Sequence, residues 1–522
     1  MISKKLTVIA SLLCSFVLFS CSKGDPTTCK GWTKKLKSPV KAGDAVRNLG
    51  DMRCKDSIPK LEELFTLGSY QSEILQAIKA IHEPAASVSI LKKGLAIPEV
   101  SSLASSVVED FNLKELVPDL MNILNGDKDF KGRKNALQAL VKIEETNLAA
   151  YEDLLIKLVR DDPNVQGVMV NALAAESLGK IKSKKAVNHL IIGMFMQTQK
   201  GEKFYTKCRK ALNAIGSDAV EPLLDTLKGN NPELKEYAQK TNMHGWQWTD
   251  SPEVMQVIGD LRDTKAVAQV VENLGKELVM PVGVDAKVVD AWKVTEQNRI
   301  TMCMIALGNF GDDSVITKAK DIILNTDNDA KQRLDTATAL ALIGSDASIS
   351  ALLDIYSKEK DSRFRAPLLV PLSLALNFKN LAQFDKIASG EKSELVLDRL
   401  KGDSLEAKEI KDYLSVVRDC KDDLSCLLEK LKTGTPLQQK KAAISLAHIG
   451  NKDTLDDLIE RYPATSPQDV DLRRFLMMGF WRMGDRNLAA ELQKLIAADK
   501  EKKGAGYWVD EMEALAYALE RK

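Results

Sequence analysis

The segment DDPNVQGVMVNALAAESLGKIKSKKAVNHLI, residues 161–191, predicts a hairpin of two helices. Asp162 can cap the first helix, and Pro163 suits its first turn, where a missing N–H group costs nothing. Gly179 follows the apolar face of this helix, at the place where a helix end favours a left-handed residue. The second helix then begins near Ser183 and buries one apolar stripe against the first.

The same turn returns along the chain at Gly216, Gly259, Gly311, Gly344, Gly450 and Gly484. The intervals run from 33 residues (311 to 344) to 52 residues (259 to 311), and the gap of 106 residues from 344 to 450 is about three units long. Weaker turns fall near Gly50, His82, Asp110 and Glu144. Such periods are typical of helical solenoids, in which each hairpin packs only on its neighbours.

These repeats resemble the HEAT family, and more narrowly the HEAT-like repeats first described in phycobilisome lyases. Their pattern is an Asp-x-x-Val opening, an Ala-rich first helix, a Leu-Gly turn and then Ala-Val-x-x-Leu. Residues 161–191, 206–227 and 434–460 match it best, and the resemblance extends over 36–522. It implies an all-α fold, an α–α superhelix of about 12–13 helical hairpins. Tetratricopeptide arrays are the nearest alternative, but their Trp-x-x-Leu-Gly-x-x-Tyr signature is missing. An ordinary helical bundle would not repeat the same turn at similar intervals along so long a chain.

Composition agrees with a long helical array. A chain of 522 residues is too long for one compact core, whereas a solenoid can extend without limit. Lys plus Arg number 74 and Asp plus Glu 73, and no basic stripe is present, so we expect no nucleic-acid partner. Aromatic residues make up 5%, which argues against an all-β protein.

The spacing divides the chain into five segments. We expect a signal peptide over 1–20, a lipidated N-terminus and tether over 21–35, N-terminal repeats over 36–228, repeats with two insertions over 229–300, and C-terminal repeats with a terminal helix over 301–522.

The leader is basic at Lys4 and Lys5 and then apolar for about 14 residues, which is too short for a membrane span. It ends in Leu-Phe-Ser-Cys and resembles bacterial lipoprotein signals, which implies that Cys21 carries a diacylglycerol and an acyl chain. By the sorting behaviour of such lipoproteins, Ser22 favours the outer membrane of the cell envelope. The alternative is an ordinary secretory leader that is cleaved nearby.

Six of the eight cysteines remain after the leader and Cys21. An exported chain meets an oxidising compartment, so we expect disulfides between Cys29 and Cys54 and between Cys420 and Cys426. Cys208 and Cys303 each precede a turn glycine by eight residues in units that are not adjacent, which predicts two buried free thiols. If Gly259 were not a repeat turn, a bond between these two would become possible.

Two insertions, residues 229–256 and 276–298, lengthen the intervals around them. Insertions in solenoids map to loops that are often used for binding. The first contains His244, Trp246 and Trp248, and the second contains Trp292. Indoles on loops can anchor a partner, so these four residues are candidate binding residues. The alternative is that the indoles fold back over neighbouring helices.

No catalytic set is recognisable in the sequence. The four histidines lie far apart, and no His-x-x-x-His, Cys-x-x-Cys, phosphate loop or Gly-x-Ser-x-Gly is present, so we expect no metal, no cofactor and no enzyme activity. Lysines cluster after the leader at Lys30, Lys34, Lys35, Lys37 and Lys41. They form either a solvated face or a contact with anionic headgroups.

The sequence therefore favours a lipid-anchored scaffold that presents an extended concave surface to protein partners. A second hypothesis is an accessory factor for assembly or transport of an envelope lipid or polymer, which an exposed apolar lining would support. A cryptic enzyme is the third.

Overall fold

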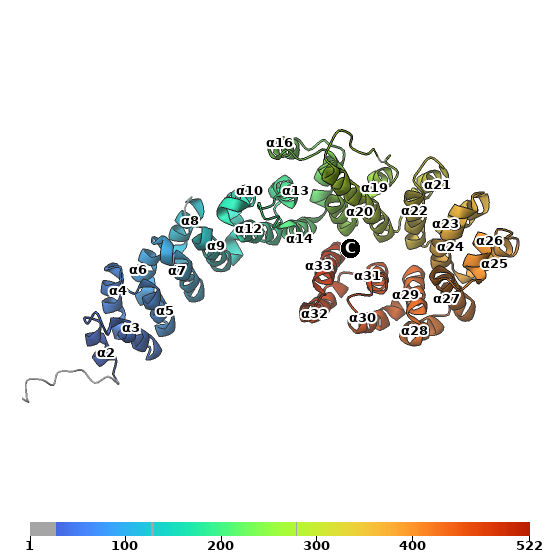
Figure 1. The fold of residues 1–522 in the computed structure, drawn as a ribbon. Coiled ribbons are helices and arrows are strands. Elements are labelled where there is room, and N and C mark those ends of the chain that lie inside the picture. The colour runs from blue at the N-terminus through green and yellow to red at the C-terminus, as the bar shows by residue number, and fades with distance from the viewer. Residues whose placement is uncertain (1–27, 127–129, 278) are drawn as a thin grey trace, which may run out of the picture. The chain divides into compact units, whose positions relative to one another are not determined.

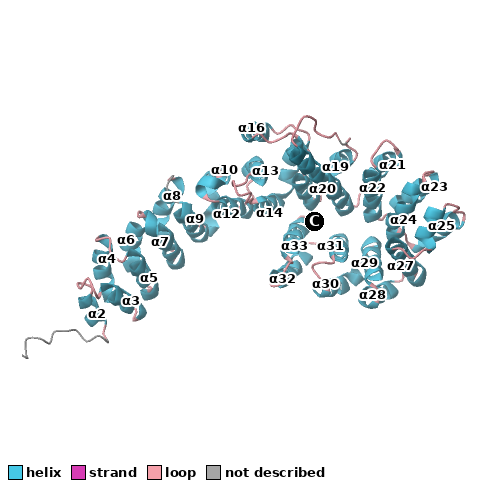
Figure 2. Cartoon of the chain, in the orientation of Figure 1, coloured by secondary structure: helices cyan, strands magenta, loops and turns pink. Residues whose placement is uncertain are grey.

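The structure, a computed structural model, describes residues 28–126, 130–277 and 279–522. The signal peptide, Cys21 and most of the expected tether lie outside these residues. The described chain is an α–α superhelix, with Gln197 and Lys203 forming its single β-bridge (Figures 1 and 2). Within it, no helix combines the length and the apolar character that crossing a bilayer would require.

The chain forms two compact units. The N-terminal unit comprises residues up to 177 together with 197–203, and the C-terminal unit comprises 178–196 and 204–522. The segments expected from glycine spacing, with limits at 228 and 300, do not coincide with these units. Glycine spacing reports the length of turns and insertions, whereas the units reflect which helices pack together.

In the N-terminal unit, first helices α3, α5, α7 and α9 stack in one layer and second helices α4, α6 and α8 in another. The helices are α2 (Cys29–Lys35), α3 (Ala42–Asp51), α4 (Ile58–Thr66), α5 (Gln71–Ile81), α6 (Pro84–Leu95), α7 (Pro98–Phe111), α8 (Val117–Asn125), α9 (Phe130–Ile143), α10 (Glu152–Arg160), α11 (Pro163–Gln166) and α12 (Val168–Lys180), within which the division into units falls.

In the C-terminal unit, first helices α18, α20, α22 and α24 stack in sequence, followed by α27, α29 and α31. The helices are α13 (Val187–Phe195), α14 (Tyr205–Ile215), α15 (Val220–Leu227), α16 (Pro232–Thr241), α17 (Trp246–Thr249), α18 (Pro252–Leu261), α19 (Val267–Leu274), α20 (Ala286–Phe310), α21 (Ile316–Leu324), α22 (Ala330–Ile343), α23 (Asp346–Lys358), α24 (Ser362–Ala375), α25 (Phe378–Ser389), α26 (Glu394–Lys401), α27 (Leu405–Cys420), α28 (Leu424–Thr433), α29 (Pro436–Ile449), α30 (Leu455–Ala464), α31 (Val470–Met483), α32 (Leu488–Lys500) and α33 (Gly506–Glu520).

The turn of the quoted segment differs from the prediction at its glycine. Asp162 does cap a helix that starts at Pro163, accepting a hydrogen bond from the Asn164 N–H group. Gly179, however, lies inside α12, and the left-handed residue is Lys182 (φ 50°). The prediction of a left-handed Gly179 is therefore wrong.

Gly179 is needed for close packing. A Cβ atom built on it would lie 2.7 Å from the Cα of Ala211 on α14, closer than side chains tolerate. Gly259 is likewise inside a helix, and its Cβ would lie 3.1 Å from the Cα of Ala306. Gly311 and Gly344 are the left-handed helix ends that the sequence predicts, with φ values of 62° and 63°. The repeated glycine thus serves two purposes that one sequence pattern cannot separate.

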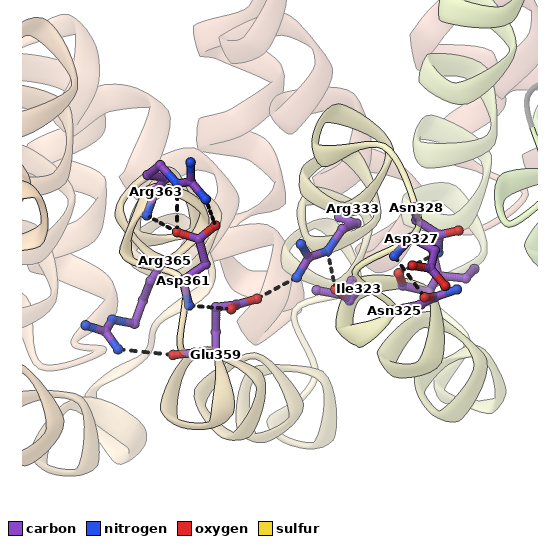
Figure 3. Close-up of polar contacts among 10 residues, drawn as sticks. Ile323, Asn325, Asp327, Asn328, Arg333, Glu359, Asp361, Arg363 and Arg365 are labelled. Carbon is purple, nitrogen blue, oxygen red and sulfur yellow. Dashed lines mark hydrogen bonds and ion pairs between the residues drawn. The ribbon is translucent and has the colours of Figure 1, made fainter.

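Buried arginines on first helices link successive repeats. Arg333 on α22 donates through Nε to the Ile323 carbonyl at the end of α21, at 2.6 Å, and pairs with Glu359 at the end of α23 (Figure 3). Arg473 on α31 donates through Nη2 to the Thr465 carbonyl at the end of α30, at 2.9 Å, and pairs with Asp499 near the end of α32. Each guanidinium satisfies carbonyls at a helix end and adds positive charge where the helix dipole is negative.

The arginine links carry a sequence signature that the glycine pattern does not reveal. The pairs Arg333–Glu359, Arg365–Glu391 and Arg473–Asp499 are all separated by 26 residues. Each arginine also follows, by four residues, the aspartate that caps its helix: Asp329, Asp361 and Asp469. Asp-x-x-x-Arg followed by an acidic residue 26 positions later therefore marks these repeats more directly than glycine does.

We expect Asp499→Asn to destabilise its repeats strongly. Arg473 is fully buried, and it stacks over the Tyr462 ring at 4.4 Å. Removing the carboxylate leaves a buried guanidinium without its counter-charge, which costs about 3 to 5 kcal/mol. Native-state hydrogen exchange at the amides of α31 and α32 measures this loss.

The matched control is Arg363→Met, which breaks an ion pair with Asp361 at the exposed surface (Figure 3). Exposed pairs contribute little, so no measurable change is expected. Equal exchange in the wild type and Asp499→Asn would contradict the assignment of Arg473 as a link between repeats.

Candidate functional site

The C-terminal unit closes on itself. Its last helix, α33, packs against α14 and α18 at the start of the unit (Figure 1). Arg209 on α14 lies between two carboxylates, donating to Asp260 on α18 at 2.7 Å and to Glu511 on α33 at 2.7 Å. Next to it, Lys210 pairs with Glu513 on α33 at 2.9 Å. The closure is therefore made by charged groups that are buried or half-buried.

Cationic side chains satisfy the ends of first helices inside this closed unit. Arg482 donates to two carbonyls at the end of α22, each at 2.8 Å. Arg521 Nη1 donates to the Asn213 carbonyl near the end of α14 at 2.6 Å. Lys522 Nζ donates to the Trp481 and Gly484 carbonyls at the end of α31, at 2.7 and 2.9 Å. Lys441, fully buried, donates to two carbonyls at the end of α24, both at 2.6 Å. Several helix ends of the C-terminal unit are thus satisfied by side chains of the same unit.

Two further contacts lie in the same unit. The His448 ring lies against Gly344, where a Cβ atom would overlap it. Burial lowers the pKa of His448 well below its usual value, with Arg482 adding to the effect, so the ring is neutral. The Arg262 guanidinium stacks over Trp481 at 4.9 Å. These contacts leave a pocket of about 280 Å³ in the C-terminal unit, which Gly344, Leu376 and His448 help to line.

The two insertions pack on each other. Helices α16 and α17 come from residues 229–256, whereas most of 276–298 lengthens α20, which reaches 25 residues. Helix α17 packs against α20 and α15. Trp248 on α17 and Trp292 on α20 are both buried. The Trp248 and Trp292 indoles therefore fold back over neighbouring helices, in agreement with the alternative to a binding role.

The other two candidate residues lie nearer the surface. The exposed His244 ring is parallel to that of half-buried Trp246, with centroids 6.0 Å apart. Lys276 of the second insertion pairs with Asp250 of the first, which fixes the insertions to each other. The structure brings the candidate residues of both insertions into one region, but it leaves only His244 exposed.

The structure contains both disulfides that the sequence suggests. Cys29 and Cys54 are bonded with their Cα atoms 5.5 Å apart, and Cys420 and Cys426 with theirs 5.2 Å apart. The first bond attaches α2 to the turn that leads into α4, at the beginning of the N-terminal unit. The second closes the turn between α27 and α28.

Cys208 and Cys303 are free and buried. Burial raises the pKa of both thiols, that of Cys303 to about 12, so neither is a reactive thiolate. Within the described ranges, no three His, Cys, Asp or Glu side chains are arranged to hold a metal ion.

The N-terminal unit carries an open groove of about 700 Å³, here named the Met169 groove. Helices α7 and α9, the start of α12 and the 197–203 hairpin form its walls. It is lined by Ser102, Lys134, Asn135, Pro163, Asn164, Gln166, Gly167, Val168, Met169, Val170, Thr198, Gln199, Lys200 and Glu202. The Met169 side chain is 57% exposed.

The Met169 groove is built from satisfied polar contacts with one exception. Asn164 Oδ1 accepts from the Gln199 N–H group at 2.8 Å, which holds the hairpin against α11. Gln166 is buried, and its Nε2 donates to the Leu158 carbonyl at 2.6 Å. Its Oε1 has no hydrogen-bond partner among the described residues. A buried acceptor without a partner is costly, so this oxygen is a local weak point in the wall of the groove.

No protein family model matches this chain, and no curated protein matches it. Among solved structures, importin β in a polyethylene glycol condition is similar over 99% of this chain and 82% of its own, with 12% identity and a TM-score of 0.43. An engineered protein matches 82% of this chain and 98% of its own, with 17% identity and a TM-score of 0.27. Karyopherin Kap121p bound to the SUMO protease Ulp1p matches 92% and 58%, with 12% identity and a TM-score of 0.26. Likeness at this level says nothing about the partners of this chain.

Lys441 should make stability depend on pH. Burial lowers its pKa from 10.5 to about 7, although the negative charge of Asp422 opposes this. Between these pH values the unfolded chain holds a proton that the folded chain has released, so stability contributed by this site rises with pH. We expect the free energy of unfolding of the wild type, minus that of Lys441→Met, to increase from pH 7 to 10.

Urea unfolding at a series of pH values measures that difference, and all other titrating groups cancel in it. A flat difference would contradict a buried, deprotonating Lys441. A difference that falls with pH would reverse the sign of the argument.

Proposed function

We propose that this protein is a lipid-anchored scaffold of the bacterial cell envelope that binds protein partners through the Met169 groove. The observation that carries this proposal is the contrast between the two units. In the C-terminal unit, cationic side chains such as Arg482 and Lys441 occupy the ends of first helices, and the pocket that remains beside His448 has a volume of only about 280 Å³. The N-terminal unit, in contrast, leaves a groove of about 700 Å³ open.

The chemistry of the Met169 groove suits a polypeptide. Exposed Met169 offers a flexible apolar contact of the kind used at adaptable binding surfaces. Lys134 and Lys200 add positive charge, and Glu202 adds negative charge, so the groove can pair with acidic or basic side chains of a partner.

The anchor rests on the sequence. The leader over 1–20 and Cys21 favour lipidation, and Ser22 favours the outer membrane. The disulfides of the C-terminal and N-terminal units suit an oxidising compartment, as expected for an exported chain.

An exposed apolar lining would favour a role in carrying an envelope lipid or polymer. The Met169 groove instead contains Lys134, Asn135, Gln166 and Glu202 among its lining residues, so a protein partner fits it better.

A photoreactive benzoylphenylalanine at position 169 should form discrete covalent adducts with partner proteins in intact cells. The matched control is the same residue at position 405, because Leu405 is 82% exposed but lies in the C-terminal unit. Adducts on gels at 169 and none at 405 are expected. Absence of adducts at 169, or the same adducts at both positions, would contradict partner binding through the Met169 groove.

A further inference from the structure

A second groove, of about 570 Å³, lies at the beginning of the N-terminal unit between α2 and α4. The Cys29–Cys54 disulfide fixes its walls, because Cys54 directly precedes the turn that leads into α4. We name it the lysine groove, after Lys30, Lys34 and Lys37, which line it together with Leu64 and Leu67.

The lysine groove has an excess of positive charge. Its charged lining residues are four lysines and two acidic residues, and Lys60 pairs with Glu63 at 2.5 Å. None of the described carboxylates pairs with Lys30, Lys34 or Lys37, and all three side chains are exposed. Lys30 and Lys34 lie one turn apart on the same face of α2, and Lys37 follows directly after the helix. Three cations without an ion-pair partner among the described residues therefore line one groove.

Apolar groups lie beside these cations. Leu67 is 79% exposed, although moving a leucine side chain out of water is favourable. Leu64 lies one turn before it on α4 and is half-buried. A face that combines exposed leucine with lysine is typical of segments that lie in the interface of an anionic bilayer.

We propose that the lysine groove docks on the surface of an anionic lipid bilayer. This inference rests on the proposed lipid anchor, because Cys21 lies only seven residues before Thr28, where the described chain begins. Seven residues span at most about 25 Å when fully extended. Acyl chains at Cys21 would thus hold the lysine groove close to the headgroups. Docking would orient the first repeat relative to the membrane.

The test uses residues 21–522 with Cys21→Ser, so that no lipid contributes, and sedimentation with vesicles. Binding should be stronger to equimolar phosphatidylglycerol and phosphatidylcholine than to phosphatidylcholine alone. The triple variant Lys30→Glu, Lys34→Glu, Lys37→Glu should lower the partition coefficient on anionic vesicles at least about tenfold, since each lysine near the surface contributes to the attraction. Circular dichroism and the intact Cys29–Cys54 bond check its fold.

The matched control reverses three exposed lysines of the C-terminal unit, Lys265, Lys360 and Lys503, to Glu. It changes the net charge equally and should lower binding less than about twofold, because none of its three lysines lines the lysine groove. Equal losses in both triple variants, or equal binding to both kinds of vesicle, would overturn the proposal.

Leu67→Ser tests whether the exposed leucine contributes to docking on the bilayer. It should weaken binding to anionic vesicles, and a variant that binds them as tightly as the parent would overturn the apolar part of the proposal. Loss of vesicle docking would leave the adducts at position 169 unaffected, so failure here is distinguishable from failure of the scaffold.

Discussion

Cationic side chains at the carboxyl ends of helices are the constraint on which this fold depends. Every helix ends in carbonyls without an intrahelical partner, and in a solenoid many of these ends are buried between repeats. Arg333 and Arg473 satisfy the ends of second helices, while Lys441 and Arg482 satisfy the ends of first helices. A neutral apolar side chain at any of these positions would leave carbonyls unsatisfied.

The same interaction explains why the two units differ. In the C-terminal unit, Arg521 on the segment after α33 reaches the carbonyl end of α14, and Arg209 pairs with Glu511 in the opposite direction. The array therefore meets its own beginning and has no exposed terminal face there. The N-terminal unit has no such closure among its described residues, and it keeps two open grooves, centred on Met169 and on Lys34. Binding is thus proposed at the two grooves of the N-terminal unit and not at the contacts that close the C-terminal unit.

Much of the fold could be predicted from the sequence. The period of the turns predicts the helical hairpins, and Pro163 marks a helix start as expected. The turns expected near His82 and Asp110 fall at the left-handed residues His82 and Asn112. Gly179 shows the limit of the pattern, because glycine is equally favoured by a helix end and by a close helix contact, and only the position of Ala211 distinguishes them.

The candidate sites were less predictable. Trp248 is buried because α17 packs on α20, a contact between insertions that repeat spacing cannot reveal. The Met169 groove combines α7, α9 and a hairpin from distant parts of the sequence. Closure is also invisible to a repeat analysis, since Arg209 and Glu511 are separated by 302 residues. The 26-residue spacing of Arg473 and Asp499, in contrast, was present in the sequence as a readable signal.

Closure of the C-terminal unit is tested most directly by a zero-length carbodiimide crosslink on the unmodified chain, mapped by mass spectrometry. This reagent joins a lysine and a carboxylate that are already in contact, as Lys210 and Glu513 are at 2.9 Å. Lys320 and Asp354, which are paired at 2.6 Å and whose lysine is as exposed as Lys210, serve as the internal control. The account predicts a crosslinked peptide that joins α14 to α33 and disappears in Lys210→Gln. Crosslinking of the control pair without any peptide joining α14 to α33 would contradict it.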